Sequence, residues 1–213
     1  MNNIKRIIFL LALVLPVVCF AQGNVAEALL DKAVSTIKAS KGVQMNFTMS
    51  MYDGDDEELF TEKGVLKMEG EKFVLLAEQM KLWCDGETQW SYLPQNNEIY
   101  ISEPNADDAR AFSPVHLMQL YKSGYRCVVD KALATAKDDA VVMTPVARGD
   151  DIKKVIVLLD KKSCMPAHLT VCYDNGSMAR IKVDSYKNDC KFSSKEFRCR
   201  EKNFPGAEVV DMR

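Results

Sequence analysis

The chain has 213 residues, with 28 Lys or Arg against 30 Asp or Glu and a formal net charge of −2. The basic residues form no block, so the charge pattern excludes a nucleic-acid-binding surface. The length fits one domain after allowance for an N-terminal leader.

The first 21 residues have the three parts of a secretory signal peptide. Lys5 and Arg6 form the positive region, Ile7–Phe20 form the apolar region, and the stretch ending at Ala21 carries the small residues that precede cleavage. We predict cleavage after Ala21, so that residues 22–213 form a single exported domain. The apolar run is shorter than the roughly 18–20 residues that span a bilayer, which disfavours a membrane anchor.

The cysteines leave two questions open. Cys19 suggests lipid attachment, but Val18 stands where such motifs prefer a small side chain, which disfavours this alternative. The later cysteines are even in number and permit disulfides in an exported protein, but their spacing cannot choose a pairing. No C-x-x-C occurs, so neither a zinc knuckle nor a redox pair is indicated, and buried free thiols are an equal alternative. These cysteines are Cys84, Cys127, Cys164, Cys172, Cys190 and Cys199.

An amphipathic helix is predicted first, followed by a strand. Asn24 is a suitable N-cap, apolar residues then recur at helical spacing, and Gly42 ends the pattern. From Val43 to Met51 apolar and polar residues alternate strictly, which predicts a strand with one buried and one solvated face.

Short strands separated by turns continue the chain. The acidic loop Asp53–Glu58 lacks the spacing of a calcium loop and is interpreted as a solvated connection. Asp85-Gly86 favours a tight hairpin turn, and the hairpin carries both tryptophans of the chain, Trp83 and Trp90. Such spacing without helices indicates an antiparallel meander. The predicted strands are residues 59–68, 72–78, 81–84, 88–93 and 98–102.

A helical insert is predicted at residues 105–121, ended by Gly124, and strands then resume. The complete pattern predicts a mainly β (α+β) fold. One curved antiparallel sheet of about eleven strands would form an incomplete β-barrel, capped by the N-terminal helix and the central insert. The later predicted strands are residues 125–130, 140–144, 153–160, 167–173, 178–185 and 190–198.

Nothing in the sequence indicates catalysis. His116 and His168 are the only histidines, too few for a histidine-rich metal site, and no phosphate-binding, dinucleotide-binding, nucleophile-elbow or H-E-x-x-H motif occurs. We therefore predict a non-enzyme without a metal or other cofactor.

The apolar face of the predicted sheet has two interpretations. Its side chains form either a filled core under the helices or the lining of a lipid cavity, because a strongly curved sheet leaves space that side chains do not fill easily. Methionine adapts to flexible apolar ligands, which favours a cavity that holds acyl chains, with the helices around Leu29 and Leu117 as lids. The candidate lining residues are Met45, Phe47, Met49, Leu66, Met68, Phe73, Leu75, Trp90, Tyr92, Leu117 and Met118.

The chain resembles the LolA-type periplasmic carriers of outer-membrane lipoproteins. The hairpin Asp85–Tyr92 is similar to their D-G-x-T-x-W-x-Y motif, and neighbouring motifs occur in the family's order over nearly all of the predicted mature chain. These are Phe47-Thr48 for F-[ST]-Q, Gly64-Val65-Leu66 with Lys72-Phe73 for G-x-L…F, and Phe197 with Phe204–Asp211 for the closing F…P-x-G-x-x-V-x-D.

The resemblance implies an incomplete barrel of eleven antiparallel strands that holds lipoprotein acyl chains. It also implies a location in the periplasm of a Gram-negative bacterium. The implied partners are an inner-membrane ABC-type release complex and an outer-membrane receptor, with transient membrane contact. A carrier of this type needs no nucleotide or metal itself, and we expect a monomer.

The sequence departs from the family pattern at two places. Well-studied carriers have an Arg shortly before the Phe of the second strand pair, whereas Met68–Phe73 contains no Arg and two carboxylates. Lys72 could substitute only as a point charge. Thr48 is followed by Met49 where the family has Gln. Two alternatives therefore stay open: a module on the same scaffold that senses or shuttles another amphiphile, such as a glycolipid or a mislocalised lipoprotein, and a scaffold with a filled core.

Overall fold

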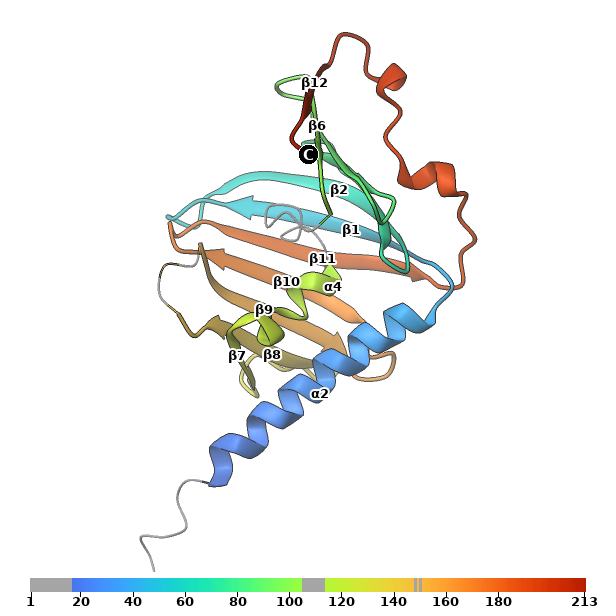
Figure 1. The fold of residues 1–213 in the computed structure, drawn as a ribbon. Coiled ribbons are helices and arrows are strands. Elements are labelled where there is room, and N and C mark those ends of the chain that lie inside the picture. Colours follow the sequence, from blue (N-terminus) through green and yellow to red (C-terminus); the bar gives the residue numbers. More distant parts are fainter. Residues whose placement is uncertain (1–16, 105–113, 148, 150) are drawn as a thin grey trace, which may run out of the picture.

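Twelve strands form one open, curved sheet in the part of the chain that the structure describes (Figure 1). This structure is a computed structural model, and it describes residues 17–104, 114–147, 149 and 151–213. The strands are β1 Val43–Tyr52, β2 Glu58–Glu69, β3 Lys72–Leu76, β4 Lys81–Cys84, β5 Gln89–Leu93, β6 Glu98–Ser102, β7 Tyr125–Val129, β8 Asp138–Pro145, β9 Ile152–Asp160, β10 Pro166–Tyr173, β11 Met178–Lys187 and β12 Glu208–Asp211. The helices are α2 Val17–Ala39, α4 Pro114–Leu117 and the 3-10 helices η1 Leu120–Ser123, η2 Ser194–Phe197 and η3 Glu201–Asn203.

The strand order is β12-β6-β5-β4-β3-β2-β1-β11-β10-β9-β8-β7. Every neighbouring pair is antiparallel except β12 with β6, which is parallel. β1 joins the two halves of the sheet because it pairs with β2 on one side and β11 on the other. The predicted fold class, a mainly β protein with one curved, unclosed sheet, is thus confirmed.

The sheet has two faces with different coverings. We call the face that packs with α2 and α4 the inner face and the opposite one the outer face. On the inner face, buried side chains from both halves of the sheet form one cluster with Leu30 and Ile37 of α2 and Leu117 of α4. α2 runs along the β7 side of the sheet (Figure 1). Buried and exposed residues recur along α2 because the apolar row predicted from the sequence faces the sheet.

The helix start predicted at Asn24 is wrong, because α2 begins at Val17, within the predicted leader. Residues 17–24 contain no proline, and their one glycine, Gly23, costs a helix only about 1 kcal/mol. No helix in the described residues is both long and apolar enough to cross a membrane.

The strand predicted at residues 190–198 is also wrong. This segment leaves the sheet and contains η2, which Ser193 starts by accepting a hydrogen bond from the Lys195 N–H, while Glu196 accepts one from the Ser193 N–H. Phe197 is fully buried on the outer face. The chain then returns to the sheet as β12, a strand that the sequence analysis did not predict.

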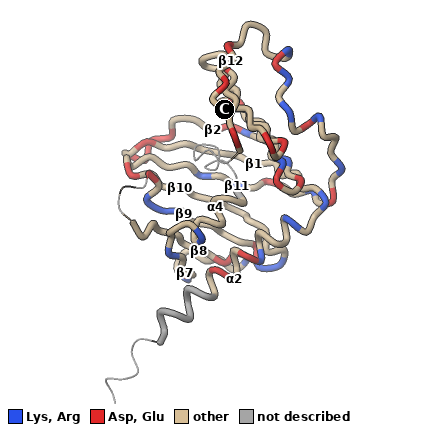
Figure 2. Tube along the Cα trace, in the orientation of Figure 1, with Lys and Arg blue, Asp and Glu red and all other residues tan. Residues whose placement is uncertain are grey.

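This C-terminal segment, residues 188–207, passes along the outside of the sheet from β11 to the far edge at β6 (Figure 1). Basic and acidic residues are interspersed along it (Figure 2). Part of the predicted helical insert is present as α4 and η1, and Gly124 ends η1 in the left-handed conformation with a φ of 92°. Residues 105–113 of that insert lie outside the described residues.

Candidate functional site

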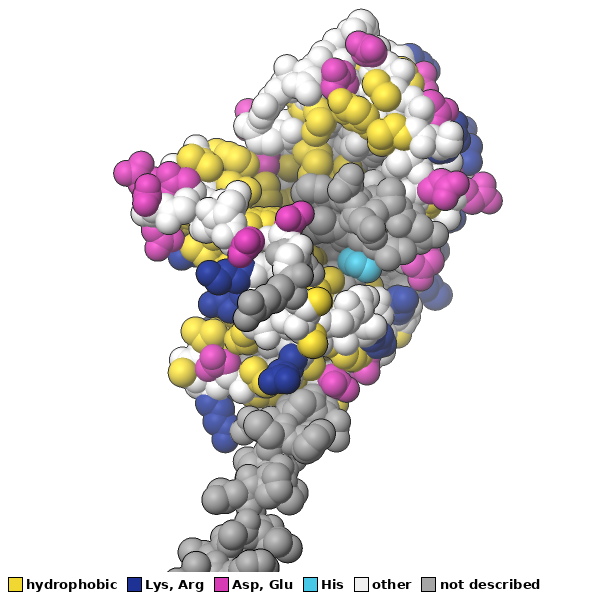
Figure 3. Space-filling model, turned by 60° about the vertical axis from the view of Figure 1, so that its left-hand side comes forward, with side chains coloured by type: hydrophobic (Ala, Val, Ile, Leu, Met, Phe, Trp, Pro, Cys, Tyr) yellow, Lys and Arg dark blue, Asp and Glu magenta, His cyan; other side chains and the backbone are white. Residues whose placement is uncertain are grey.

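A cavity of about 290 Å³ opens on the inner face of the sheet. Hydrophobic side chains gather in a hollow of the molecular surface in Figure 3. Its walls come from the central strands of both sheet halves and from α4. The lining residues are Met45, Phe47, Met49, Met51, Phe60, Glu62, Leu66, Leu75, Ala77, Gln79, Met80, Leu93, Leu117, Pro166, Leu169, Val171, Tyr173, Ala179, Ile181 and Val183.

The alternation in β1 places four successive odd-numbered residues, Met45 to Met51, along the cavity. In the β1–β2 register, Met45 lies opposite Leu66 and Phe47 lies opposite Gly64. Gly64 has a steric role, since a Cβ atom at this position would come within 2.2 Å of the Phe47 ring. The absent side chain lets this ring pack against the β2 backbone as part of the wall.

The opposite wall comes from β10 and β11. Leu169 pairs with Ile181 and Val171 pairs with Ala179, and all four side chains line the cavity. The sequence analysis identified both strands but did not assign these residues to the site. Buried and less buried residues alternate in β10 and β11 as they do in ordinary core strands. Only the pairing of β1 with β11 brings these four side chains to the methionines of β1.

Three lining residues in the described chain carry polar side-chain groups: Glu62, Gln79 and Tyr173. Burial raises the pKa of the Tyr173 phenol. Glu62 is 6% exposed, and its Oε2 accepts hydrogen bonds from the backbone N–H groups of Glu78 and Gln79. The sequence analysis missed Glu62, although a Glu at an inner-face position of an alternating strand was a signal that could have found it.

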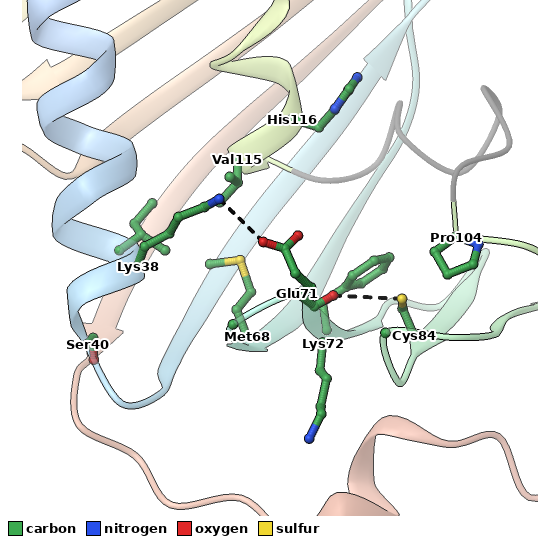
Figure 4. A pocket seen from close by; sticks show the side chains of 13 residues that line it. Lys38, Ser40, Met68, Glu71, Lys72, Cys84, Pro104, Val115 and His116 are labelled. Carbon is green, nitrogen blue, oxygen red and sulfur yellow. Dashed lines mark hydrogen bonds and ion pairs between the residues drawn. The ribbon is translucent and has the colours of Figure 1, made fainter.

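A second pocket of about 270 Å³ lies between α2, the β2–β3 turn and α4. Lys38 reaches across it toward Glu71, with 3.4 Å between Nζ and Oε1, whereas Lys72 extends away from the other lining side chains (Figure 4). The Cys84 thiol donates to the Glu71 carbonyl, and burial raises its pKa. His116 also lines this pocket while the next residue, Leu117, lines the cavity, so α4 separates the two spaces.

The structure separates the eleven candidate residues into four groups. Met118 is fully buried in the inner-face core, Met68 and Phe73 line the second pocket, and Trp90 and Tyr92 belong to the outer face. The structure brings the remaining six together around the cavity: Met45, Phe47, Met49, Leu66, Leu75 and Leu117.

The strand register explains why Trp90 and Tyr92 lie on the other face. Trp90 pairs with Trp83, which in turn pairs with Val74, and these neighbours point away from α2 and α4. The C-terminal segment covers them, with Phe204 stacked at 4.1 Å from the Tyr92 ring centroid. The sequence analysis grouped these aromatics with the methionines, but β4 and β5 present Leu82 and Ser91 at the corresponding inner-face positions.

Within the described residues, no three His, Cys, Asp or Glu side chains are grouped as a metal site would require. The cysteines from Cys84 to Cys199 are free thiols in this structure. Burial raises the pKa of the Cys127 and Cys199 thiols to about 11, so both stay protonated near neutral pH.

Comparisons with solved structures find similar chains of low sequence identity. An uncharacterized conserved protein from Thermus thermophilus matches with a TM-score of 0.56 and 13% identity, covering 87% of this chain and 98% of that one. A LolA superfamily protein from Nitrosomonas europaea has a TM-score of 0.45 and 10% identity, covering 82% and 97%. A putative outer membrane lipoprotein-sorting protein domain from Vibrio parahaemolyticus has a TM-score of 0.42 and 14% identity, covering 81% and 97%.

No curated protein matches the chain. A family profile does match, and it covers well over half of the sequence, from the start of α2 to the β10–β11 turn. That profile describes the outer membrane lipoprotein carrier protein LolA and matches residues 17–175. The chain therefore belongs to the LolA family.

Proposed function

We propose that the protein is a periplasmic carrier that shields lipoprotein acyl chains in the inner-face cavity and moves them from the inner to the outer membrane. The observation that carries this proposal is the cavity itself, whose lining is apolar at all but three positions among the described residues. Membership of the LolA family, described as lipoprotein carriers, supports the same function.

The physical chemistry of the cargo favours such a cavity. Each methylene that leaves water for an apolar environment contributes about 0.8 kcal/mol, so an acyl chain crosses an aqueous compartment only inside a shielding protein. Methionines at positions 45, 49 and 51 give the wall flexible, polarizable side chains that adapt to such chains. Binding of this kind requires neither a cofactor nor catalysis.

The size of the cavity limits what it holds in the observed state. At about 290 Å³ it is near the lower end of the roughly 300–1,000 Å³ typical of ligand pockets. A cargo with several acyl chains therefore requires the cavity to widen. α4 is the element that we expect to move, because Leu117 contributes to the wall and the helix has only four residues.

The proposal also covers export and partners. Residues 1–21 would act as a cleaved signal peptide and direct the mature chain to the periplasm. There we expect transfer from an inner-membrane ABC-type release complex to an outer-membrane receptor. The segment from Met68 to Phe73 has no Arg, and its Glu71 instead pairs with Lys38 of α2, so handover would use a different charge arrangement from that of the well-studied carriers.

Native mass spectrometry with lipid extraction, on protein purified from the periplasm, tests the proposal. We expect a bound lipoprotein or acyl-chain mass in the wild type and its loss in Phe47→Glu, which puts a charge in the cavity wall. Ala179→Leu, which fills the cavity without a charge, should also reduce the bound mass. Leu59→Glu makes the same kind of change at a residue that is 59% exposed and should leave binding unchanged.

Circular dichroism shows whether each variant is folded before binding is compared. A wild type that carries no lipid, and that takes up none from a lipid-modified peptide, would contradict the carrier proposal. Retention of a glycolipid instead of a lipoprotein would favour the alternative of a module for another amphiphile.

A further inference from the structure

One buried polar atom at the cavity wall has no partner. Glu62 holds its Oε2 against two backbone N–H groups at residues 78 and 79, but its Oε1 is buried and, among the described residues, accepts no hydrogen bond. A buried acceptor without a partner is unfavourable and is rare in folded proteins. Glu62 therefore requires an explanation beyond packing.

The two backbone hydrogen bonds fix the orientation of this carboxyl group. Glu62 lies opposite Met49 in the β1–β2 register, so its side chain enters the inner face among methionine and aliphatic side chains. None of the ion pairs between described residues includes Glu62. A fixed acceptor in an apolar wall is suited to a ligand that brings its own donor.

We propose that Glu62 is a specificity-determining residue that selects acyl ligands carrying a hydrogen-bond donor, an N–H or O–H group, beside the chain. This inference rests on the proposed function, since it requires an acyl chain in the cavity. A hydrogen bond to a charged acceptor is stronger than one between neutral groups, and more so where water is excluded. The donor would be either the amide N–H of an N-acylated terminus or a hydroxyl on the chain itself.

Matched short-chain probes isolate this interaction. N-methyloctanamide and methyl octanoate have the same shape but differ in one N–H group, and methyl 3-hydroxyoctanoate adds a chain hydroxyl to the ester. Equilibrium dialysis of each probe against the mature protein gives its affinity. The amide-to-ester and hydroxyester-to-ester affinity ratios then cancel the chain contribution when variants are compared.

We expect Glu62→Leu to lower at least one of these ratios about tenfold or more, from the usual strength of a hydrogen bond to a charged group. The ratio that falls identifies the donor as an amide or a chain hydroxyl. Glu62→Gln retains the shape, but its amide oxygen must accept from the N–H groups of Glu78 and Gln79, which turns its NH₂ donor to the cavity. It should remove the preference in the same way while keeping the fold.

Glu58→Leu at the exposed start of β2 is the matched control and should leave both ratios unchanged. Equal ratios in the wild type and in both Glu62 variants would overturn the inference, with water as the only partner of Oε1, and would leave the carrier proposal standing. Failure of the folded wild type to bind any of the three probes would overturn both.

Discussion

Gly64 shows how one residue without a side chain shapes the cavity. The Phe47 ring packs against Gly64 and occupies the space that a Cβ atom at position 64 would need. Phe47 is 7% exposed and is enclosed by the inner-face core, so its ring cannot simply move into solvent.

Gly64→Ala should therefore push the Phe47 ring into the cavity. We expect a loss of about 1–3 kcal/mol in the free energy of unfolding, the usual effect of overpacking, together with weaker binding of acyl probes. Urea denaturation and probe binding measure the two effects. Adding Phe47→Leu to Gly64→Ala should restore part of the stability, because the smaller side chain leaves room for the new methyl group.

Gly54→Ala is the control for this prediction, since a Cβ there comes no closer than 3.4 Å to its neighbours. Equal stability of Gly64→Ala and the wild type would show that the Phe47 ring moves without cost, which would contradict the role assigned to Gly64.

At the scale of elements, the C-terminal segment covers the outer face of β3–β5 and is linked to it by side chains as well as by apolar contact. Arg198 donates from Nε to Asp85 Oδ2 at 2.7 Å, and Lys67 of β2 pairs with Glu196 of η2 at the same distance. Phe197 and Phe204 fill the space over Val74 and Trp83. The C-terminal segment and the β4–β5 hairpin therefore stabilise each other.

The Asp85 carboxylate makes this linkage sensitive to pH. Burial raises its pKa, but the backbone N–H groups of Thr88 and Glu87 and the Arg198 guanidinium more than offset burial, so the pKa lies below its ordinary value. A group with a lowered pKa in the folded state stabilises the protein above its unfolded-state pKa, near 4, and loses this contribution as the pH falls. Asp85→Asn removes the titrating group but keeps a side-chain acceptor for the turn.

We expect the wild type to be more stable than Asp85→Asn at pH 7 and pH 5, with the difference shrinking toward pH 3. Urea denaturation at these three pH values measures it. A difference in stability that stays constant with pH would mean that the charge of the Asp85 carboxylate does not help to hold the C-terminal segment on the sheet.

At the scale of the whole molecule, one sheet connects two apolar clusters on opposite faces. The inner-face cluster extends from α2 through β1 to β7, and the outer-face cluster lies under the C-terminal segment. Because β2 and β3 contribute side chains to both faces, loss of one cluster should remove support from the other.

We therefore predict a single cooperative unfolding transition. Both tryptophans belong to the outer-face cluster, so their fluorescence reports the C-terminal side of the sheet, whereas far-ultraviolet circular dichroism reports all strands. The two signals should give the same midpoint in urea. A tryptophan transition at lower urea would show that the outer-face cluster opens independently, and Trp90→Phe would show whether Trp83 alone reports it.

The sequence alone determined the parts of this protein that depend on local periodicity. Strict alternation defined β1, and the Asp85-Gly86 turn defined the β4–β5 hairpin, because backbone and turn chemistry act between residues that are near in the chain. The same local patterns predicted six of the residues that line the cavity. They also supported the resemblance to the LolA family that the profile match then confirmed.

Only the tertiary structure decided which face each strand presents and which distant strands meet. Trp90 and Tyr92 have the same alternation as the cavity residues, but the register with β4 turns them outward. A bulge in β11 keeps both Val183 and Tyr186 on the inner face, three residues apart, where simple alternation would separate them. Strand pairing depends on contacts between residues far apart in the chain, which local patterns do not encode.

The same reason explains the remaining differences. β12 pairs in parallel with β6 from more than a hundred residues away, and Glu62 acquires its partners from the β3–β4 turn only after folding. The sequence thus determined every strand of the described residues except β12, although it also predicted a strand at residues 190–198 that the structure lacks. It also determined the apolar character of the cavity. The far wall of the cavity, and the one buried carboxyl group among its described lining residues, were decided by how those strands come together.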